Sequence, residues 1–462
     1  MQAAVAAGHP ATTAAGIEIL EEDGSAADAA VAATLASCVA ETVMTGLLGG
    51  GHAIYLDGPS GRVRNLDCFV AVPGLGVEPR EVELLHLDVP FGAELVHYAV
   101  GPGSCAVPGL PAGLDALWRE HGRLPWTRLV EPALRLARAG VEFPAAHAAC
   151  LAMLAPVMTM NEGAQIYSPG GELLQAGERL EQPGLVAALE AVAAEGASEA
   201  VYGGSIGDLL LRLCEERGGL VTAGDLEAYD VGWSEPVEVS YLDGTLLTRA
   251  GLSGIAETVP RLPRLHGVAE TERVLALVDV LQTSREGDGD TTNVTVVDRD
   301  GSACVFTTSL GLGSGDFLPG LDLHLNSMLG EADLLRGRLE PGGRMMSMMA
   351  PTLSFDAGGL ALAAGAAGGT RLRTALLSVI AGILDEGLSP VESVERSRFH
   401  PAPDVVNAEP GVDDAALEQL ETRGRTVRRW PGRHHYFGGV SVVSRTGAAG
   451  DPRRNGAAAT LL

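Results

Sequence analysis

Asp290-Thr291-Thr292-Asn293-Val294-Thr295-Val296-Val297-Asp298 is the stretch of this 462-residue chain that decides the fold. A second β-rich run, Ala303-Cys304-Val305-Phe306-Thr307-Thr308-Ser309, follows after the turn Arg299-Asp300-Gly301-Ser302. Two runs of alternating side chains around an Asp-Gly turn predict a β-hairpin whose first strand begins at a threonine. The polar composition of residues 284–290 predicts a solvent-exposed loop before the hairpin, which a cleavage site requires but which is common to loops in general.

The position of Thr291 at the start of this hairpin suggests a chemical role. If the bond between Asp290 and Thr291 were cut, one residue would carry both a hydroxyl nucleophile and a free α-amine as its base. An α-amine has a pKa of about 8, so it can accept a proton near neutral pH. A lone Asp-Thr-Thr is more often an ordinary strand start. The catalytic interpretation therefore depends on the rest of the chain.

Composition and charge narrow the class of protein. Hydrophobic residues make up 46% of the chain and charged residues 20%, which predicts a globular protein of one large or two closely packed domains. The formal net charge is -27, from 59 acidic and 32 basic side chains. Such a surface repels phosphate backbones, so nucleic acid is not an expected partner. Solubility explains the acidity adequately.

Metal sites, disulfides and membrane segments are not predicted. The six cysteines have no CxxC pair and no close spacing, which favours buried thiols. His434 and His435 are adjacent and lack partners at ligand spacing. The N-terminal residues show no signal-peptide pattern, and no apolar run is long enough to span a bilayer. With Met1 as the native start, we expect a cytoplasmic protein without a membrane segment.

Other elements frame the hairpin. Residues 1–220 are predicted to be largely helical, with Ser25 and Asp28 forming a capping box before a helix over 26–40. A strand pair is predicted over 237–241 and 245–248, around an Asp-Gly turn.

A second glycine-rich turn is a candidate oxyanion site. Gly365-Ala366-Ala367-Gly368-Gly369-Thr370 predicts the end of a strand, a turn and the start of a helix over 370–384. Backbone N–H groups of Gly368 and Gly369 at a helix N-terminus could hold a developing oxyanion. A tight turn without chemistry is the alternative.

Several motifs occur in the order found in one family. Besides the hairpin they are Gly8-His9-Pro10-Ala11-Thr12, Gly24-Ser25-Ala26-Ala27-Asp28-Ala29-Ala30-Val31-Ala32, Gly49-Gly50-Gly51, Ala106-Val107-Pro108-Gly109 and Ser397-Arg398-Phe399-His400. On these motifs, almost the whole chain resembles the gamma-glutamyltranspeptidases, which are self-cleaving N-terminal-nucleophile hydrolases. The resemblance implies an α+β fold, the αββα four-layer sandwich. It also implies autocleavage between Asp290 and Thr291. The resulting large subunit, residues 1–290, and small subunit, residues 291–462, would form one αββα unit as a heterodimer.

The resemblance implies roles for four catalytic residues. Thr291 matches the nucleophile that becomes the new N-terminus, and Ser309 matches the hydroxyl residue that hydrogen-bonds it. Gly368 and Gly369 match the oxyanion glycines. The expected protein is a hydrolase or acyltransferase that forms an acyl-enzyme with a small-molecule acyl donor and requires neither a cofactor nor a metal.

The substrate pocket departs from the family pattern. Phe69 stands where family members usually carry an arginine that clamps the α-carboxylate of the glutamyl group, so charge-assisted hydrogen bonds are lost. The serine pair that also holds this carboxylate is reduced to Ser347 followed by Met348. Glu331 matches the acidic residue that binds the donor amine and is one methylene longer than the usual aspartate. Gly311 lies near the place of a family asparagine.

Changed specificity accounts for these substitutions more simply than lost activity, because they concern one pocket. The first hypothesis is an active, self-processing hydrolase with an atypical acyl donor, such as one from a natural-product pathway. One alternative is hydrolysis of a C–C bond that releases an oxalyl group, as is thought for relatives in alkylproline biosynthesis. Another is ordinary gamma-glutamyl hydrolysis or transfer, with Arg344 or Arg371 replacing the lost arginine. A non-catalytic scaffold is the least favoured, because Thr291 and Ser309 are intact.

Overall fold

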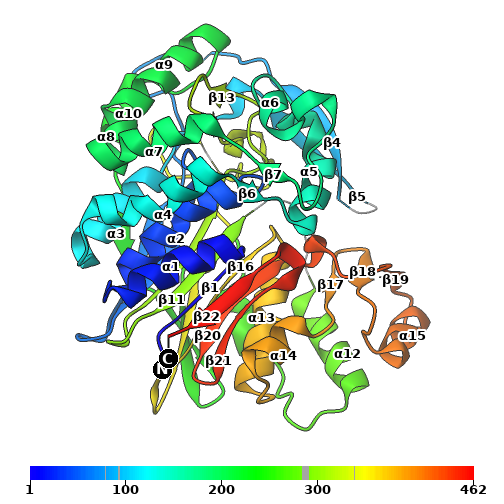
Figure 1. Ribbon diagram of the computed structural model, residues 1–462. Helices are drawn as coiled ribbons and strands as arrows, with labels where there is room; N and C mark the ends of the chain where they lie inside the picture. The colour runs from blue at the N-terminus through cyan, green and yellow to red at the C-terminus, as the bar shows by residue number, and fades with distance from the viewer. Residues whose placement is uncertain (79, 92–93, 283–290, 338, 462) are drawn as a thin grey trace.

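Two antiparallel sheets form the centre of the molecule in the computed structural model, which describes residues 1–78, 80–91, 94–282, 291–337 and 339–461 (Figure 1). Asp290, on one side of the expected cleavage site, lies outside the described residues. Within them, the first sheet has seven strands, in the order β22 (Ala457–Thr460), β1 (Ala4–Ala7), β11 (Thr292–Val297), β12 (Ala303–Ser309), β2 (Gly50–Asp57), β3 (Arg62–Cys68) and β8 (Gly232–Ser234). The second has six, in the order β21 (Gly447–Gly450), β20 (Gly439–Ser444), β16 (Gly359–Ala367), β15 (Thr352–Asp356), β10 (Gly244–Thr248) and β9 (Val237–Tyr241).

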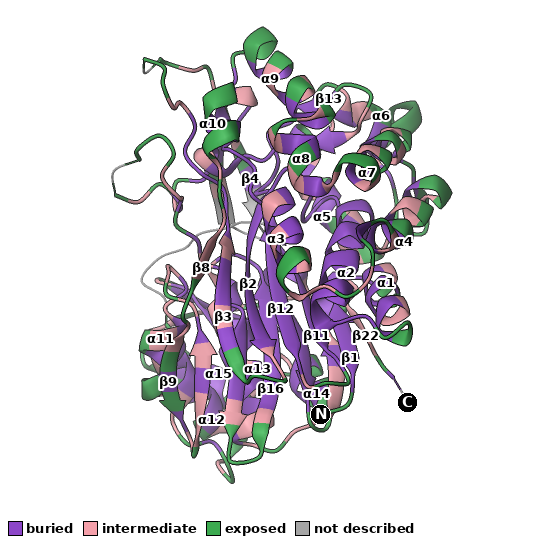
Figure 2. Cartoon of the chain, turned by 90° about the vertical axis from the view of Figure 1, so that its left-hand side faces the viewer, coloured by how far each residue is buried: buried purple, intermediate pink, exposed green. Residues whose placement is uncertain are grey.

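Side chains on opposite faces of these strands belong to different apolar clusters. Residues of both sheets share one cluster, which includes Ile54, Val305, Leu353, Ala363 and Val443. The first sheet also packs against α1 (Pro10–Glu21) and α2 (Ala26–Ala40), whereas the second packs against α12 (Glu270–Leu281) and α13 (Arg371–Leu384). Alternation along each strand explains this arrangement. Figure 2 shows the central strands of the first sheet, β1, β11, β12 and β2, as buried, whereas the edge strands β22 and β8 are partly exposed. The chain is mixed α/β, as expected.

Shorter elements surround this centre. The remaining α-helices are α3 (Leu110–His121), α4 (Trp126–Ala139), α5 (Ala145–Met158), α6 (Gly163–Tyr167), α7 (Pro183–Glu195), α8 (Ala197–Tyr202), α9 (Ser205–Arg217), α10 (Ala223–Ala228), α11 (Ile255–Thr258), α14 (Pro390–Glu395) and α15 (Asp414–Thr422). The short strands are β4 (Leu85–Phe91), β5 (Glu94–Val100), β6 (Val141–Glu142), β7 (Arg179–Leu180), β13 (Phe317–Leu318), β14 (Leu323–His324), β17 (Phe399–Pro401), β18 (Val405–Ala408) and β19 (Thr426–Arg429). In the part of the chain that the structure describes, each helix is too short or too polar to cross a bilayer.

Local sequence signals predicted several elements well. The capping box is present, with the Ser25 Oγ accepting from the Asp28 N–H at 3.0 Å, and the hairpin β9–β10 matches the expected strand pair. The prediction that residues 1–220 are largely helical is incomplete, because the strands β1 to β7 also lie there. β1 reads Ala-Val-Ala-Ala, and alanine has little intrinsic preference for strands. This strand pairs with β11 on one side and β22 on the other.

Candidate active site

The β11–β12 hairpin brings Thr291 and Ser309 to the same end of the first sheet. Thr292 pairs with Thr308, so the next pair in the same antiparallel register is Thr291 with Ser309. Both side chains are buried, with 5% of Thr291 and 3% of Ser309 exposed. The Ser309 Oγ accepts a hydrogen bond from the Gly311 N–H at 2.9 Å. The two hydroxyl residues expected from the sequence therefore lie side by side.

One narrow cavity, about 30 Å³ in volume, has two unlike walls. The first, which we call the threonine wall, consists of Thr291, Ser309 and Gly369. The other lining residues, which we call the methionine wall, are Phe69, Met328, Glu331, Leu334, Ser347, Met348, Met349 and Leu372. All the catalytic and substrate-binding residues expected from the sequence line this cavity, except Gly368, which is next to Gly369 in the chain. Methionine side chains are flexible, so the second wall can repack around a larger group.

Gly368 and Gly369 form the turn between β16 and α13. Their φ angles are +123° and +54°, in the region that favours glycine. A Cβ on Gly368 would lie 2.8 Å from the Cα of Gly438, so a side chain does not fit there without a backbone shift. The turn leads into the N-terminus of α13, where the N–H groups of Arg371 and Leu372 donate to the carbonyl oxygens of Gly368 and Gly369 at 3.0 and 3.2 Å.

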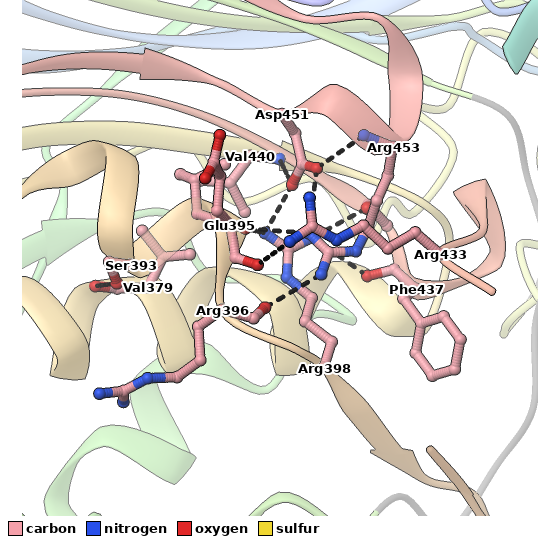
Figure 3. Close-up of polar contacts among 12 residues, drawn as sticks. Val379, Ser393, Glu395, Arg396, Arg398, Arg433, Phe437, Val440, Asp451 and Arg453 are labelled. Atoms are coloured by element: carbon pink, nitrogen blue, oxygen red, sulfur yellow. Dashed lines mark hydrogen bonds and ion pairs between the residues drawn. The ribbon is translucent and has the colours of Figure 1, made fainter. Parts of the chain in front are cut away.

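A buried ionic network joins Arg398, Asp451 and Arg453 (Figure 3). The Arg398 guanidinium donates to the Gly438 carbonyl oxygen at 2.9 Å and pairs with Asp451 at 2.5 Å. Arg453 pairs with Asp451 at 3.3 Å and with Glu409 at 2.5 Å. Burial alone would raise the pKa of Asp451, but the two arginines hold it below its ordinary value. The network therefore fixes Gly438 against the glycine turn.

A buried carboxyl group lies next to the start of β11. Glu41 directly follows α2 and is 1% exposed. One of its oxygens accepts from the Thr12 Oγ1 at 2.6 Å, and the other accepts from the Thr292 Oγ1. Burial raises the pKa of Glu41 to about 7, although these hydroxyl donors and Arg454 oppose the rise. Glu41 was not among the site residues expected from the sequence. The available signal was an acidic residue at the C-terminal end of an apolar helix, where the helix dipole disfavours it.

A buried arginine near the C-terminus contacts Thr291 directly. Arg454 ends the short helix η6 (Pro452–Arg454) and is 4% exposed. Its Nη1 donates to the Thr291 carbonyl oxygen at 3.2 Å and lies 3.0 Å from the Met44 Sδ. Arg454 was not expected at the site either, because no sequence pattern links it to Thr291, which lies 163 residues away in the chain. Side chains from distant parts of the chain thus hold both residues of the Thr291-Thr292 pair.

The methionine wall carries no cationic side chain among the described residues that line the cavity. The Phe69 ring stacks on the His52 ring, with the ring centroids 5.4 Å apart. Arg344 donates to the Phe69 carbonyl oxygen at 2.6 Å, and Arg371 donates to the Tyr436 carbonyl oxygen at 3.1 Å. Neither arginine is among the residues that line the cavity.

Glu331 supplies the one carboxyl group among the described residues of the cavity lining. It is 5% exposed. Gly311 has a φ of +71°, and a Cβ there would lie 2.3 Å from the Glu331 Oε1. The glycine therefore makes room for the longer acidic side chain. In the same wall, the Ser347 Oγ accepts from the Met349 N–H at 3.2 Å.

The six cysteines and the adjacent histidines, His434 and His435, lie outside the cavity. All six cysteines are buried free thiols, as the sequence predicted. Within the described ranges, no cluster of three or more histidine, cysteine, aspartate or glutamate side chains could hold a metal ion.

Comparison with known proteins matches this chain along nearly its full length. The family model described as gamma-glutamyltranspeptidase matches residues 12–273 and 268–461. The acylase ACY 1 proenzyme of Pseudomonas sp. strain SE83 is 28% identical over 95% of this chain and 89% of its own length. Glutathione hydrolase proenzyme 1 of Schizosaccharomyces pombe is 26% identical over 93% of this chain and 79% of its own length.

A solved structure shares the fold. The crystal structure of cephalosporin acylase from Bacillus halodurans superposes with a TM-score of 0.84 and covers 100% of this chain and 96% of its own. Its sequence identity is 20%, so the likeness concerns the fold.

Proposed function

The chain belongs to the gamma-glutamyltranspeptidase family and is an enzyme of the hydrolase and acyltransferase type, and from this premise we propose that Thr291 is its N-terminal nucleophile. The observation that carries the proposal is the threonine wall. Thr291, Ser309 and Gly369 come from two strands and a separate glycine turn, yet they line one cavity. A scaffold without chemistry has no physical need for this convergence.

The proposed reaction begins with chain cleavage. Cleavage between Asp290 and Thr291 frees the α-amine of Thr291, which then accepts the proton of its own hydroxyl as the oxygen attacks the acyl carbonyl. Ser309 hydrogen-bonds the nucleophile, and N–H groups of the Gly368-Gly369 turn stabilise the oxyanion. The acyl–leaving-group bond breaks as the ammonium returns the proton to the leaving group. Water or an amine then attacks the acyl-enzyme ester, releases the acyl product and restores the threonine.

The subunit organisation follows from the same proposal. Residues 1–290 form the large subunit and residues 291–462 the small one, and β11 of the small subunit stays paired with β1 of the large subunit. The proenzyme names of the relatives support a processed precursor. The sheet pair with helices packed on each sheet supports an αββα sandwich.

The acyl donor that fits the cavity best lacks a carboxylate next to its amine. A γ-glutamyl donor needs a cation for its α-carboxylate, and the described lining residues supply none. Glu331 can still pair with a donor ammonium group, whereas its charge repels a carboxylate. We infer an amino-substituted or apolar acyl donor. The acylase among the relatives favours an amide as the bond that is cut.

Intact mass of the purified protein under denaturing conditions tests the proposed nucleophile. The parent protein should give two fragments that divide between Asp290 and Thr291, and the Thr291→Ala variant should give one chain. A matched Thr295→Ala variant, altered on the same strand, should still be cut. One uncut chain in the parent would remove the α-amine base and overturn the proposal.

A further inference from the structure

Glu41 holds the residue that follows the nucleophile, and we propose that it is a positioning residue for Thr291, acting through Thr292. The inference rests on the proposed function of Thr291. It concerns a carboxyl group that does not line the cavity and has no part in the chemical steps described above.

The contacts of Glu41 converge on the first strand position after the nucleophile. Successive side chains of β11 point to opposite faces, so the Thr292 hydroxyl lies on the face away from that of Thr291. There it donates to Glu41, which also receives the Thr12 hydroxyl. A Cβ on Gly8 would lie 2.3 Å from the Glu41 Oε2 and 2.6 Å from the Thr292 Oγ1. The backbone thus closes tightly around this pair.

The hydrogen bond between Thr292 and Glu41 becomes important after chain cleavage. Once the bond before Thr291 is cut, that residue is a chain terminus, and chain termini lose order unless other contacts hold them. Arg454 holds the Thr291 carbonyl oxygen, and Glu41 holds the next side chain. Small displacements of a nucleophile lower its rate strongly, because attack needs a fixed geometry. The contact therefore maintains the orientation of the hydroxyl and the amine after cleavage.

The charge of Glu41 decides the direction of these hydrogen bonds. An ionised carboxylate accepts from both threonines, whereas a protonated one must donate to one of them. Cys38 on α2 and Arg454 on η6 act directly on Glu41. The His147 ring on α5 interacts with Arg454 and with the His9 ring at the N-terminus of α1. Burial brings the pKa of Glu41 to about 7. The rate should therefore fall when Glu41 gains a proton, in addition to the loss caused by protonation of the α-amine.

The test measures the pre-steady-state burst of p-nitrophenolate from p-nitrophenyl acetate between pH 5 and 9. Protonation of the α-amine gives a slope of about one in log rate against pH, and protonation of Glu41 lowers the log rate by up to about one further unit around pH 7, so the slope of the parent there should exceed one. Glu41→Gln keeps the size of the side chain but cannot ionise, so the slope should fall to about one. Its burst rate at pH 8 should drop about tenfold, because a charge-assisted hydrogen bond is lost. Glu22→Gln, at the exposed C-terminal end of α1, is the matched control and should behave like the parent.

The outcomes separate this inference from the proposed function. A parent burst that Thr291→Ala abolishes, together with an unchanged slope and rate in Glu41→Gln, overturns the inference alone. A burst that survives in Thr291→Ala overturns the proposed nucleophile. If Glu41→Gln does not fold, Thr292→Val carries the test, since it removes only the donor hydroxyl. The same tenfold loss, restored by Thr292→Ser, supports the inference, and parent-like activity of Thr292→Val contradicts it.

Discussion

The two walls of the cavity are built by different kinds of structure. The threonine wall comes from β11, β12 and the turn between β16 and α13, where hydrogen-bonded register fixes each position. Most of the methionine wall lies in segments without strand or helix, including Ser347, Met348 and Met349. Such segments can change their side chains without disturbing a sheet. The difference teaches that the reaction and the choice of substrate can vary independently in this fold.

The surroundings of the two walls differ in the same way. Buried charges hold the residues of the threonine wall, with Glu41 on Thr292 and Arg454 on Thr291. The methionine wall is part of an apolar cluster that includes Val70, Met328, Leu334, Met345 and Met349. The arginines that contact this wall, Arg344 and Arg249, donate to its main-chain carbonyl oxygens. Changes in the threonine wall should therefore lower activity steeply, whereas changes in the methionine wall should redirect it.

The largest effect is expected at the glycine turn. Gly368→Ala places a Cβ against the Gly438 backbone and distorts the oxyanion donors, so the burst rate with p-nitrophenyl acetate should fall about 10² to 10³-fold, or about 3–4 kcal/mol. Gly359→Ala is the control, because Gly359 also has a positive φ but an open surrounding. If the burst rate of Gly368→Ala stays within threefold of the parent rate, the turn does not stabilise the oxyanion.

The next effect concerns stability and pH. The folded-state pKa of Glu41 is raised from 4.5 to about 7, so its contribution to stability is fully present below pH 4.5 and is lost as the pH rises through 7. Between pH 4.5 and 8, the parent should lose about 3 kcal/mol of unfolding free energy relative to Glu41→Gln. Urea denaturation of both proteins at each pH measures this difference. A difference that does not change with pH would show that Glu41 titrates normally.

A smaller loss is expected at Ser309. Ser309→Ala removes the hydroxyl beside the nucleophile and should lower the burst rate about tenfold to a hundredfold, or about 1.5–3 kcal/mol. Ser309→Thr keeps the hydroxyl and should retain most of the rate. Equal losses in both variants would indicate disturbed packing, and the hydroxyl would then have no specific role.

The smallest effect is expected in the methionine wall. Phe69→Arg introduces a cation beside the cavity and should shift the preference between γ-glutamyl and 4-aminobutanoyl p-nitroanilides about tenfold toward γ-glutamyl, or about 1.4 kcal/mol. Phe69→Met, a neutral change, should leave the ratio of kcat/KM values unchanged. If Phe69→Arg and Phe69→Met give the same ratio of kcat/KM values, residue 69 does not determine the choice of acyl donor.

The residues of the threonine wall could be predicted from the sequence, whereas the buried residues that hold them, Glu41 and Arg454, could not. Thr291, Ser309 and the glycine pair belong to short motifs with a local signature, and the structure brings them together. Glu41 and Arg454 have no such signature, because their roles come from contacts across more than 160 residues. The helical prediction for the N-terminal half failed at β1 for a similar reason. Its alanines form a strand only because neighbouring strands enclose them.

The decisive measurement compares two substrates that differ by a single carboxylate, γ-glutamyl-p-nitroanilide and 4-aminobutanoyl-p-nitroanilide, with the parent and the Thr291→Ala variant. An intact threonine wall beside a wall without a cation predicts a kcat/KM at least about tenfold higher for the 4-aminobutanoyl substrate, and no turnover of either by Thr291→Ala. A preference for the γ-glutamyl substrate, or turnover that persists in Thr291→Ala, would contradict the account.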